Sequence, residues 1–182
     1  FYRTLNELGI SVLTMDLRNH GNSPVSDGML HMGAAEWPDV AAVANWLDQH
    51  HHSNLPRIVL GASMGGSTAI HAIASGLAVD AVILLDPLLD VFDSMKHAGQ
   101  VVTGIPAPLF TLAAHAAILK YQLPHGERGP LKMGIELEVP ILLMQDWDDP
   151  VTRSHFAAEL AASNPHVTLK KVPEIHIDAS CL

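Results

Sequence analysis

The stretch Gly61-Ala62-Ser63-Met64-Gly65-Gly66 is the most informative part of this sequence. It comes directly after an apolar run, residues 57–60, and directly before residues 67–74, which are rich in alanine and isoleucine. An apolar run that ends at a glycine is typical of a buried strand, and an alanine-rich stretch favours a helix. The pattern therefore predicts a strand, a sharp turn and a helix, with Ser63 at the turn.

The serine at this turn is a candidate nucleophile. Gly61 and Gly65, two positions before and two positions after Ser63, carry no side chain and provide the room that a strained turn needs. We expect the Ser63 hydroxyl to be exposed at the carboxyl end of a sheet strand. The backbone N–H of Met64, at the start of the following helix, would then face any negative charge that develops beside the serine.

Length, composition and charge limit the classes of protein that the chain can represent. Its 182 residues, of which 48% are apolar, suit one domain with a sizeable core. The 19 acidic residues outnumber the 10 basic ones, and the longest basic run is Lys170-Lys171, so we expect no nucleic-acid partner. The longest apolar stretch, residues 105–119, contains two prolines and is shorter than the roughly 20 residues that cross a membrane, so we expect no membrane span.

Cysteine and histidine give little sign of metal chemistry. Cys181 is the only cysteine in the sequence, so the chain can form no internal disulfide and no four-thiolate metal site. This is consistent with a reducing compartment such as the cytoplasm. His50-His51-His52 falls at an expected helix end, where we interpret it as a solvated surface run and not as a metal site.

Apolar runs alternate with stretches of helical periodicity along most of the chain. The expected strands are residues 11–16, 57–62, 80–85, 139–145 and 166–172. The expected helices are residues 35–50, 64–75, 109–121 and 154–163. The three middle strands are almost purely apolar, as is usual for parallel strands buried on both faces. The alternation predicts an α/β fold with a mostly parallel sheet that helices cover on both faces.

Residues 95–137 interrupt this alternation. They contain four prolines and several glycines, with one expected helix at residues 109–121. An insertion near the carboxyl ends of sheet strands is a candidate lid or cap over a substrate pocket. The alternative is a helix that simply packs on the sheet. We expect residues 1–182 to form a single domain that includes this insertion.

Three segments in a fixed order resemble the α/β-hydrolase superfamily, in particular its serine esterases and lipases. They are Asp16-Leu17-Arg18-Asn19-His20-Gly21-Asn22-Ser23-Pro24, the Ser63 turn, and Val139-Pro140-Ile141-Leu142-Leu143-Met144 followed by Asp149-Pro150-Val151. The resemblance covers nearly the whole chain and implies a partial α/β-hydrolase fold. Members usually have further strands before the first of these segments, so we expect the N-terminal strands to be missing; whether the C-terminal end is also incomplete stays open.

In this superfamily the catalytic residues follow the chain order serine, acid, histidine. A serine hydroxyl needs a base, and the base needs a carboxylate to orient it. Asp149 has the usual position of the acid, and Asp86 has an alternative position used by some members; we favour Asp149. We interpret Asp146 and Asp148 as solvated loop carboxylates. If the loop aspartates lie close together, their repulsion would raise at least one pKa.

His176 follows the last expected strand and is our candidate for the base. The alternative is that the base lies beyond Leu182, because Glu174 and Ile175 replace the small residues that usually precede the histidine. The Met64 N–H would be one oxyanion donor. The loop that usually supplies a second donor belongs to the N-terminal part that we expect to be missing.

The resemblance implies a serine hydrolase of the carboxylesterase type that cleaves a small-molecule ester or related acyl compound through an acyl-enzyme. It implies no metal and no organic cofactor. Nothing in the sequence separates an ester from a thioester or an amide, so a thioesterase or a peptidase of the same fold is an alternative. A catalytically silent binding protein of this fold is a second alternative, because losing the N-terminal strands would expose a hydrophobic sheet edge and remove an oxyanion donor.

Overall fold

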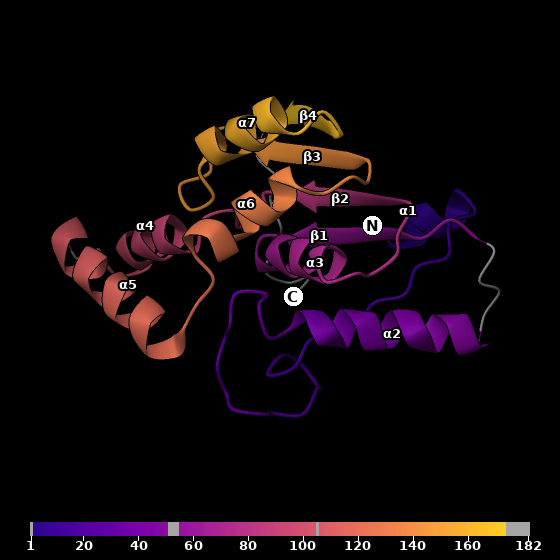
Figure 1. The fold of residues 1–182 in the computed structure, drawn as a ribbon, viewed down its shortest axis with the longest axis horizontal. Coiled ribbons are helices and arrows are strands. Elements are labelled where there is room, and N and C mark those ends of the chain that lie inside the picture. The colour runs from indigo at the N-terminus through magenta and orange to yellow at the C-terminus, as the bar shows by residue number, and fades with distance from the viewer. Residues whose placement is uncertain (1, 51–54, 105, 174–182) are drawn as a thin grey trace. The chain divides into compact units, whose positions relative to one another are not determined.

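The computed structural model describes residues 2–50, 55–104 and 106–173 of the chain. These residues divide into two compact units, Phe1–Leu30 and His31–Leu182. The first unit begins with helix α1 (Tyr2–Glu7), in which Arg3 and Glu7 form an exposed ion pair. The second unit contains the sheet and the other described helices (Figure 1).

Residues 11–16, which the sequence predicts to be a strand, do not form one. A strand needs a neighbouring strand to satisfy its backbone hydrogen bonds, and among the described residues no strand pairs with this segment. The turn that follows is held by side chains instead. Asp16 Oδ2 accepts the N–H of Asn22 at 2.9 Å. Asn19 Oδ1 accepts the N–H of Ser26 at 2.8 Å, so polar side chains of the turn brace its backbone.

The second unit is built on a parallel sheet whose strands pair in chain order. The strands are β1 (Ile58–Ala62), β2 (Ala81–Leu85), β3 (Ile141–Asp146) and β4 (Val167–Val172). All of these described strands fall on predicted strands, so those predictions are confirmed. Ala62 lies opposite Leu85, and Leu85 lies opposite Met144. The residues that follow β1, β2 and β3 therefore meet at one edge of the sheet, its carboxyl edge.

The helices of the second unit fall into a predicted and an unpredicted group. Helices α2 (Trp37–His50), α3 (Met64–Ala74), α5 (Ala107–Tyr121) and α7 (Ser154–Ser163) confirm the predicted ones. Helices α4 (Val91–Thr103) and α6 (Pro130–Ile135) and the short 3-10 helix η1 (Gly126–Arg128) lie outside the predicted helices. Residues 95–137 therefore contain more helical structure than the single helix that the sequence predicts.

Helix α4 depends on contacts that its own sequence does not reveal. Its start is capped by Asp90, whose carboxylate accepts the N–H of Asp93 at 2.7 Å. Gly99 would weaken an isolated helix, but a Cβ at this position would lie 2.3 Å from the ring of Phe110 in α5. The glycine thus permits α4 and α5 to pack closely. The two helices lie together beyond the carboxyl edge of the sheet (Figure 1).

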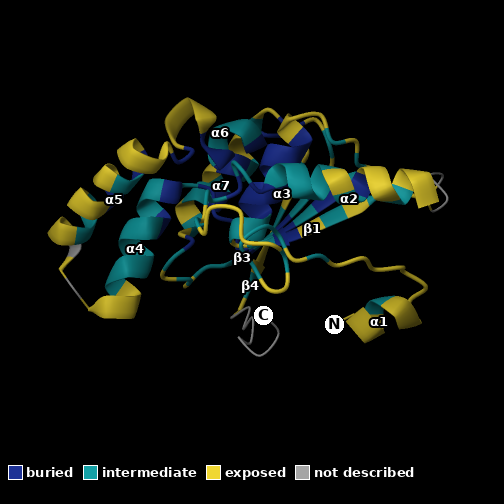
Figure 2. Ribbon diagram, turned by 90° about the horizontal axis from the view of Figure 1, so that it is seen from below, coloured by how far each residue is buried: buried dark blue, intermediate teal, exposed yellow. Residues whose placement is uncertain are grey.

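The main core lies on one face of the sheet, against α3, α6 and α7 (Figure 2). Its fully buried side chains include Ile70 of α3, Leu84 of β2 and Leu160 of α7. On the opposite face Ile58 is 57% and Leu60 is 42% exposed. The sequence predicts helices on both faces because the strands carry apolar side chains on both. In the described part of this unit, the helices that pack directly on strands, α3 and α7, lie on the buried face.

A second, smaller core joins α4 and α5 to the remainder of the unit. Leu88, Val91, Ile118 and Leu123 are buried together, and Met32 packs against them.

Among the described residues, no helix combines the length and the hydropathy that a bilayer span requires.

Candidate active site

Ser63 lies at the turn between β1 and α3, and it is exposed. Its backbone has φ 48° and ψ −117°, a left-handed conformation that residues with a side chain rarely adopt. Such strain persists only where the surroundings hold it. The Ser63 N–H donates to Leu85 O at 2.9 Å, and the Ser63 carbonyl accepts from Gly66 and Leu88 at 3.0 Å each. The predicted strand, turn and helix are present, and the neighbouring strand helps to hold the turn.

The glycines around Ser63 differ in importance. A Cβ at Gly61 would lie 2.3 Å from the carbonyl oxygen of Gly65, a distance that real side chains do not show. A Cβ at Gly66 would lie 2.8 Å from the Cβ of Pro87, just after β2. A Cβ at Gly65, in contrast, would meet no described atom within 4 Å outside its own helix turn. The expectation that Gly65 makes room for the turn is therefore wrong, because Gly61 and Gly66 face the crowded side.

Met64, the candidate oxyanion donor, is the first residue of α3. Its N–H therefore belongs to the helix start, where backbone N–H groups are not used by the helix itself. The Met64 carbonyl accepts the hydroxyl of Thr68 at 2.9 Å. Most of α3 beyond its first turn is buried in the core, so the start of the helix is firmly placed next to Ser63.

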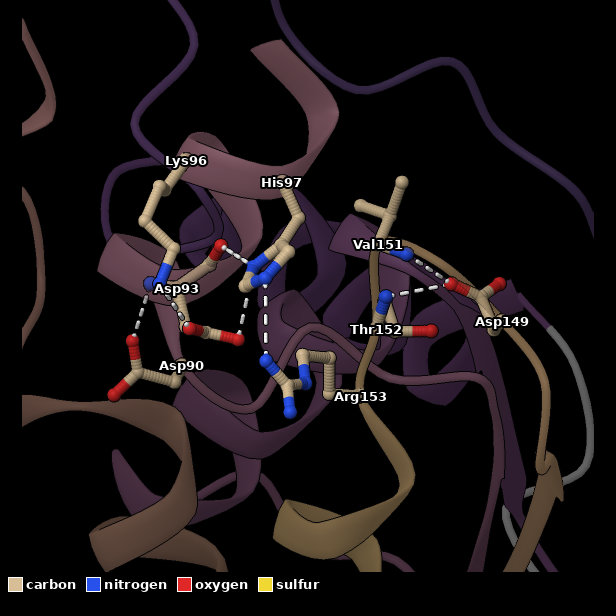
Figure 3. Close-up of polar contacts among 8 residues, drawn as sticks. All are labelled: Asp90, Asp93, Lys96, His97, Asp149, Val151, Thr152 and Arg153. Atoms are coloured by element: carbon tan, nitrogen blue, oxygen red, sulfur yellow. Dashed lines mark hydrogen bonds and ion pairs between the residues drawn. The ribbon is translucent and has the colours of Figure 1, made fainter. Parts of the chain in front are cut away.

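Asp149 lies in the loop between β3 and α7 and is half-buried. Its Oδ1 accepts the N–H groups of Val151 at 2.7 Å and Thr152 at 2.6 Å (Figure 3). These bonds close a tight loop and fix the orientation of the carboxylate. Both fall on Oδ1 in the described residues, so Oδ2 is the oxygen that remains for a further donor such as an imidazole.

Asp86 directly follows β2 and is 5% exposed. Its φ of 40° is also left-handed. Its N–H donates to Met144 O at 2.9 Å, and its Oδ1 accepts the N–H of Asp146 at 2.6 Å. Ser63 and Asp86 thus occupy matching positions after neighbouring strands, and the structure brings the nucleophile candidate and the alternative acid to the same edge.

The carboxylates at this edge influence one another. Burial raises the pKa of Asp86 to about 6, and the hydrogen bond from the Asp146 N–H acts in the opposite direction. The negative charges of Asp149 and Asp146 raise the pKa further. The sequence prediction concerned repulsion among the loop aspartates themselves; the group whose pKa is raised is instead Asp86, whose carboxyl is buried. The contribution of Asp149 to the pKa of Asp86 indicates that the two carboxyl groups are close enough for their charges to interact.

Helix α4 is joined to the loop of Asp149 by polar contacts that the sequence does not predict (Figure 3). His97 Nδ1 lies 2.8 Å from Asp93 O and 3.2 Å from Asp93 Oδ2, so Nδ1 carries a proton. In a neutral ring Nε2 then accepts from Arg153 Nη1, 3.2 Å away. Arg153 directly precedes α7. His97 and Arg153 are distant in the sequence, so no local pattern could reveal this contact.

A buried carboxylate directly before α2 was not predicted from the sequence. Glu36 is fully buried and accepts the N–H groups of His31 at 2.8 Å and Gly33 at 2.9 Å. Gly33 has φ 99°, and a Cβ there would lie 2.7 Å from Ser67 Oγ in α3. Burial lowers the pKa of His71, which lies in α3 with Ser67. The negative charge of Glu36 acts in the opposite direction and raises it. The Gly33 and Glu36 pair is the signal that could have indicated this anchored loop.

The remaining site predictions concern a base and a metal. His176, the predicted base, lies outside the described residues, as do His51 and His52. In the part of the chain that the structure describes, no group of three or more His, Cys, Asp or Glu side chains is placed to hold a metal ion.

A cavity of about 150 Å³ lies between the start of α4 and η1, and Ser63 is not among its lining residues.

An exposed serine in a left-handed turn, between a parallel strand and a helix, is typical of the α/β-hydrolase fold. The family described as serine aminopeptidase, S33, matches residues 1–125. The chain belongs to this family of the α/β-hydrolase superfamily, which confirms the resemblance drawn from the sequence.

Solved esterase structures have a similar fold. An esterase from Pyrococcus furiosus matches with a TM-score of 0.72 at 20% identity, over 93% of this chain and 63% of that chain. An esterase from Exiguobacterium antarcticum matches with a TM-score of 0.65 at 17% identity, over 93% of this chain and 75% of that chain. Puromycin hydrolase matches with a TM-score of 0.58 at 23% identity, over 78% of this chain and 21% of that chain. A search of the curated proteins finds no significant match.

Proposed function

We propose that this protein is a serine hydrolase that cleaves a carboxylic ester or a related acyl compound through an acyl-enzyme. Ser63 is the nucleophile, Asp149 the acid, His176 the base and the Met64 N–H an oxyanion donor. The observation that carries the proposal is the exposed Ser63 hydroxyl in a strained turn. Membership of the S33 family and the likeness to esterases support it.

In the proposed reaction the Ser63 hydroxyl attacks the acyl carbon, and its proton passes to the imidazole of His176. The tetrahedral intermediate places negative charge on the former carbonyl oxygen. The Met64 N–H at the start of α3 stabilises this charge, and one such donor typically contributes about 10²–10³ in rate. The imidazolium then protonates the leaving group, and a water molecule releases the acyl group from Ser63 by the same steps.

The choice of Asp149 as the acid rests on its Oδ2, which accepts no hydrogen bond from the described residues, and on its partial exposure. With Oδ1 held by two loop N–H groups, Oδ2 can accept the Nδ1–H of an imidazole and orient the ring. Asp86 is a weaker candidate, since its side chain is nearly fully buried.

Active-site labelling of the full-length gene product with a fluorophosphonate tests this proposal. We expect stoichiometric labelling that Ser63→Ala abolishes. Ser75→Ala, a change of an exposed serine directly after the other end of α3, is the matched control and should label normally. Labelling that survives in Ser63→Ala would contradict the nucleophile assignment, and absence of labelling in the unchanged protein would favour a silent binding protein.

A second candidate, cleavage of an N-terminal peptide bond, is favoured by the family description, serine aminopeptidase. The same catalytic groups would serve an amide, with His176 protonating the leaving amine. Rates on short p-nitrophenyl esters, aminoacyl p-nitroanilides and acyl-CoA thioesters separate the substrate classes. The largest kcat/KM identifies the class, and an aminoacyl substrate that exceeds every ester would replace the esterase proposal with the peptidase one.

A further inference from the structure

The hydrogen bond between Asp86 and Asp146 departs from the regular pattern of the sheet. In a parallel ladder, a residue donates its N–H to one residue of the neighbouring strand and accepts from the residue two positions later. Asp86 N donates to Met144 O at 2.9 Å, so the regular pattern would bring the Asp146 N–H to the backbone carbonyl of Asp86. The Asp146 N–H instead donates to the side-chain Oδ1 of Asp86, at 2.6 Å.

The backbone of Asp86 explains this substitution. Its φ of 40° is unfavourable for a residue with a side chain, and more so before a proline, which normally requires an extended conformation. The chain leaves the ladder at this residue, so the ladder would end one bond early on the β3 side. The carboxylate supplies the acceptor that the turned backbone does not, and the N–H of Asp146, at the end of β3, remains satisfied.

Asp86 and Asp146, the two partners of this bond, each adjoin a segment that carries a proposed catalytic residue. Asp86 follows β2, the strand that is hydrogen-bonded to the Ser63 turn. Leu85 O accepts the Ser63 N–H, and Leu88 N, just after the strand, donates to the Ser63 carbonyl. Asp146 begins the loop that carries Asp149. The Asp86 carboxylate is therefore a hydrogen-bonded connection between the turn of the nucleophile and the loop of the acid.

We propose that Asp86 is a positioning residue, whose buried carboxylate fixes the start of the Asp149 loop relative to the Ser63 turn. This inference rests on the proposed function. The role requires an acceptor at the position of Oδ1 and requires no proton transfer. The charged groups that act on Asp86 are Asp146 and Asp149, both negative, so among its described surroundings only the hydrogen bond from the Asp146 N–H favours a negative charge on Asp86. An uncharged acceptor of the same shape should therefore perform the role.

The test compares Asp86→Asn, which keeps an acceptor oxygen, with Asp86→Ala, which removes it, by ester hydrolysis in the full-length gene product. We expect Asp86→Ala to lower kcat by about 30- to 100-fold, because displacement of a catalytic group by about 1 Å can cost this much. KM should change little, since Asp86 does not touch substrate. Asp86→Asn should restore kcat to within about tenfold of the unchanged protein, the range of one ordinary hydrogen bond.

Asp80→Ala is the matched control, because Asp80 lies just before the other end of β2 and its carboxylate also accepts a backbone N–H across the sheet, that of Arg57 at 2.7 Å. It should leave kcat within about threefold, since the bond is remote from the acid loop. If Asp86→Ala does not fold, Asp86→Ser replaces it, since its hydroxyl ends one bond short of the Oδ1 position.

Two outcomes would overturn the inference. If Asp86→Asn loses as much kcat as Asp149→Asn, then Asp86 is a catalytic acid and its charge is essential. If the variants that remove the acceptor retain full kcat, the Asp86 bond has no positioning role. Ser63→Ala in the same assay separates these results from failure of the proposed function. Hydrolysis that persists in Ser63→Ala would contradict the assignment of Ser63 as the nucleophile, whatever the Asp86 variants show.

Discussion

Ser63 and Asp86 directly follow neighbouring parallel strands and both have a positive φ, yet their side chains have opposite environments. Both have a left-handed φ, 48° and 40°, and both donate their N–H to the next strand of the sheet. Ser63 is exposed, whereas Asp86 is 5% exposed and its carboxylate is hydrogen-bonded. A positive φ at the carboxyl edge of a sheet therefore does not by itself determine whether a side chain is exposed.

The residues that follow each turn account for part of the difference. After Ser63 the chain enters α3 at once, so backbone N–H groups lie next to the hydroxyl. After Asp86 comes Pro87, which has no N–H, and Leu88 donates to the Ser63 carbonyl. Pro87 also packs against Gly66. The second turn thus supports the first.

The largest effect is expected at the exposed turn. Ser63→Ala should lower kcat/KM for ester hydrolysis by about 10⁴-fold or more, as removal of a serine nucleophile does elsewhere. Steady-state kinetics on a p-nitrophenyl ester measure this, and far-UV circular dichroism confirms that the variant is folded. A loss below about tenfold would remove the functional distinction between the two turns.

The second prediction concerns which carboxylate orients the base. Asp149→Asn should lower kcat by about 10⁴-fold, because an amide in place of the carboxylate favours the wrong tautomer of the imidazole. Asp148→Asn, a change of the exposed neighbour, is the control and should leave kcat nearly unchanged. If Asp148→Asn is as damaging as Asp149→Asn, the loop as a whole and not its one oriented carboxylate is responsible.

The third prediction uses the two glycines of the Ser63 turn. Gly61→Ala should lower the free energy of unfolding by about 3 kcal/mol, because the new methyl group meets the Gly65 carbonyl. Gly65→Ala should be neutral or stabilising by up to about 1 kcal/mol, since its site is open and alanine favours a helix. Urea titration measures both. Equal losses in the two variants would show that the close approach at Gly61 is not what constrains the turn.

The smallest effect is expected at the buried turn and depends on pH. The folded protein holds the Asp86 proton up to about pH 6, whereas an unfolded aspartate releases it near 3.8. Between these values the folded state binds more protons, so the contribution of Asp86 to stability falls as the pH rises, and the cost of its buried charge is fully present above about pH 6. Asp86→Asn removes this cost.

Asp86→Asn should therefore raise the free energy of unfolding at pH 8 by about 1–2 kcal/mol, and the gain should shrink toward pH 4. Urea titrations at the two pH values measure the difference. Asp80→Asn, at an exposed carboxylate just before the other end of β2, is the control and should give no gain at pH 8, because it removes no buried charge. A gain at Asp86 that grows as the pH falls would mean that the carboxylate is stabilised, and not destabilised, in the folded protein.

The sequence alone was sufficient for the order of the sheet elements and for the Ser63 turn. Both follow from short-range rules: continuous apolar runs indicate buried parallel strands, and glycines around a serine between a strand and a helix indicate the turn. Local rules were less informative for α4, whose close packing at Gly99 depends on Phe110 of another helix. They also predicted a strand at residues 11–16, which has no neighbouring strand among the described residues.

The environments of the side chains around the turn became known only from the tertiary structure. It showed that Gly61 and not Gly65 faces the crowded side, that Asp86 is buried with its Oδ1 occupied, and that Asp149 keeps one oxygen for another donor. The sequence could name both aspartates as candidates because each follows a strand. Burial and hydrogen bonding distinguish the two carboxylates, and these depend on residues brought together from β2, β3 and the loop beyond, which no local pattern encodes.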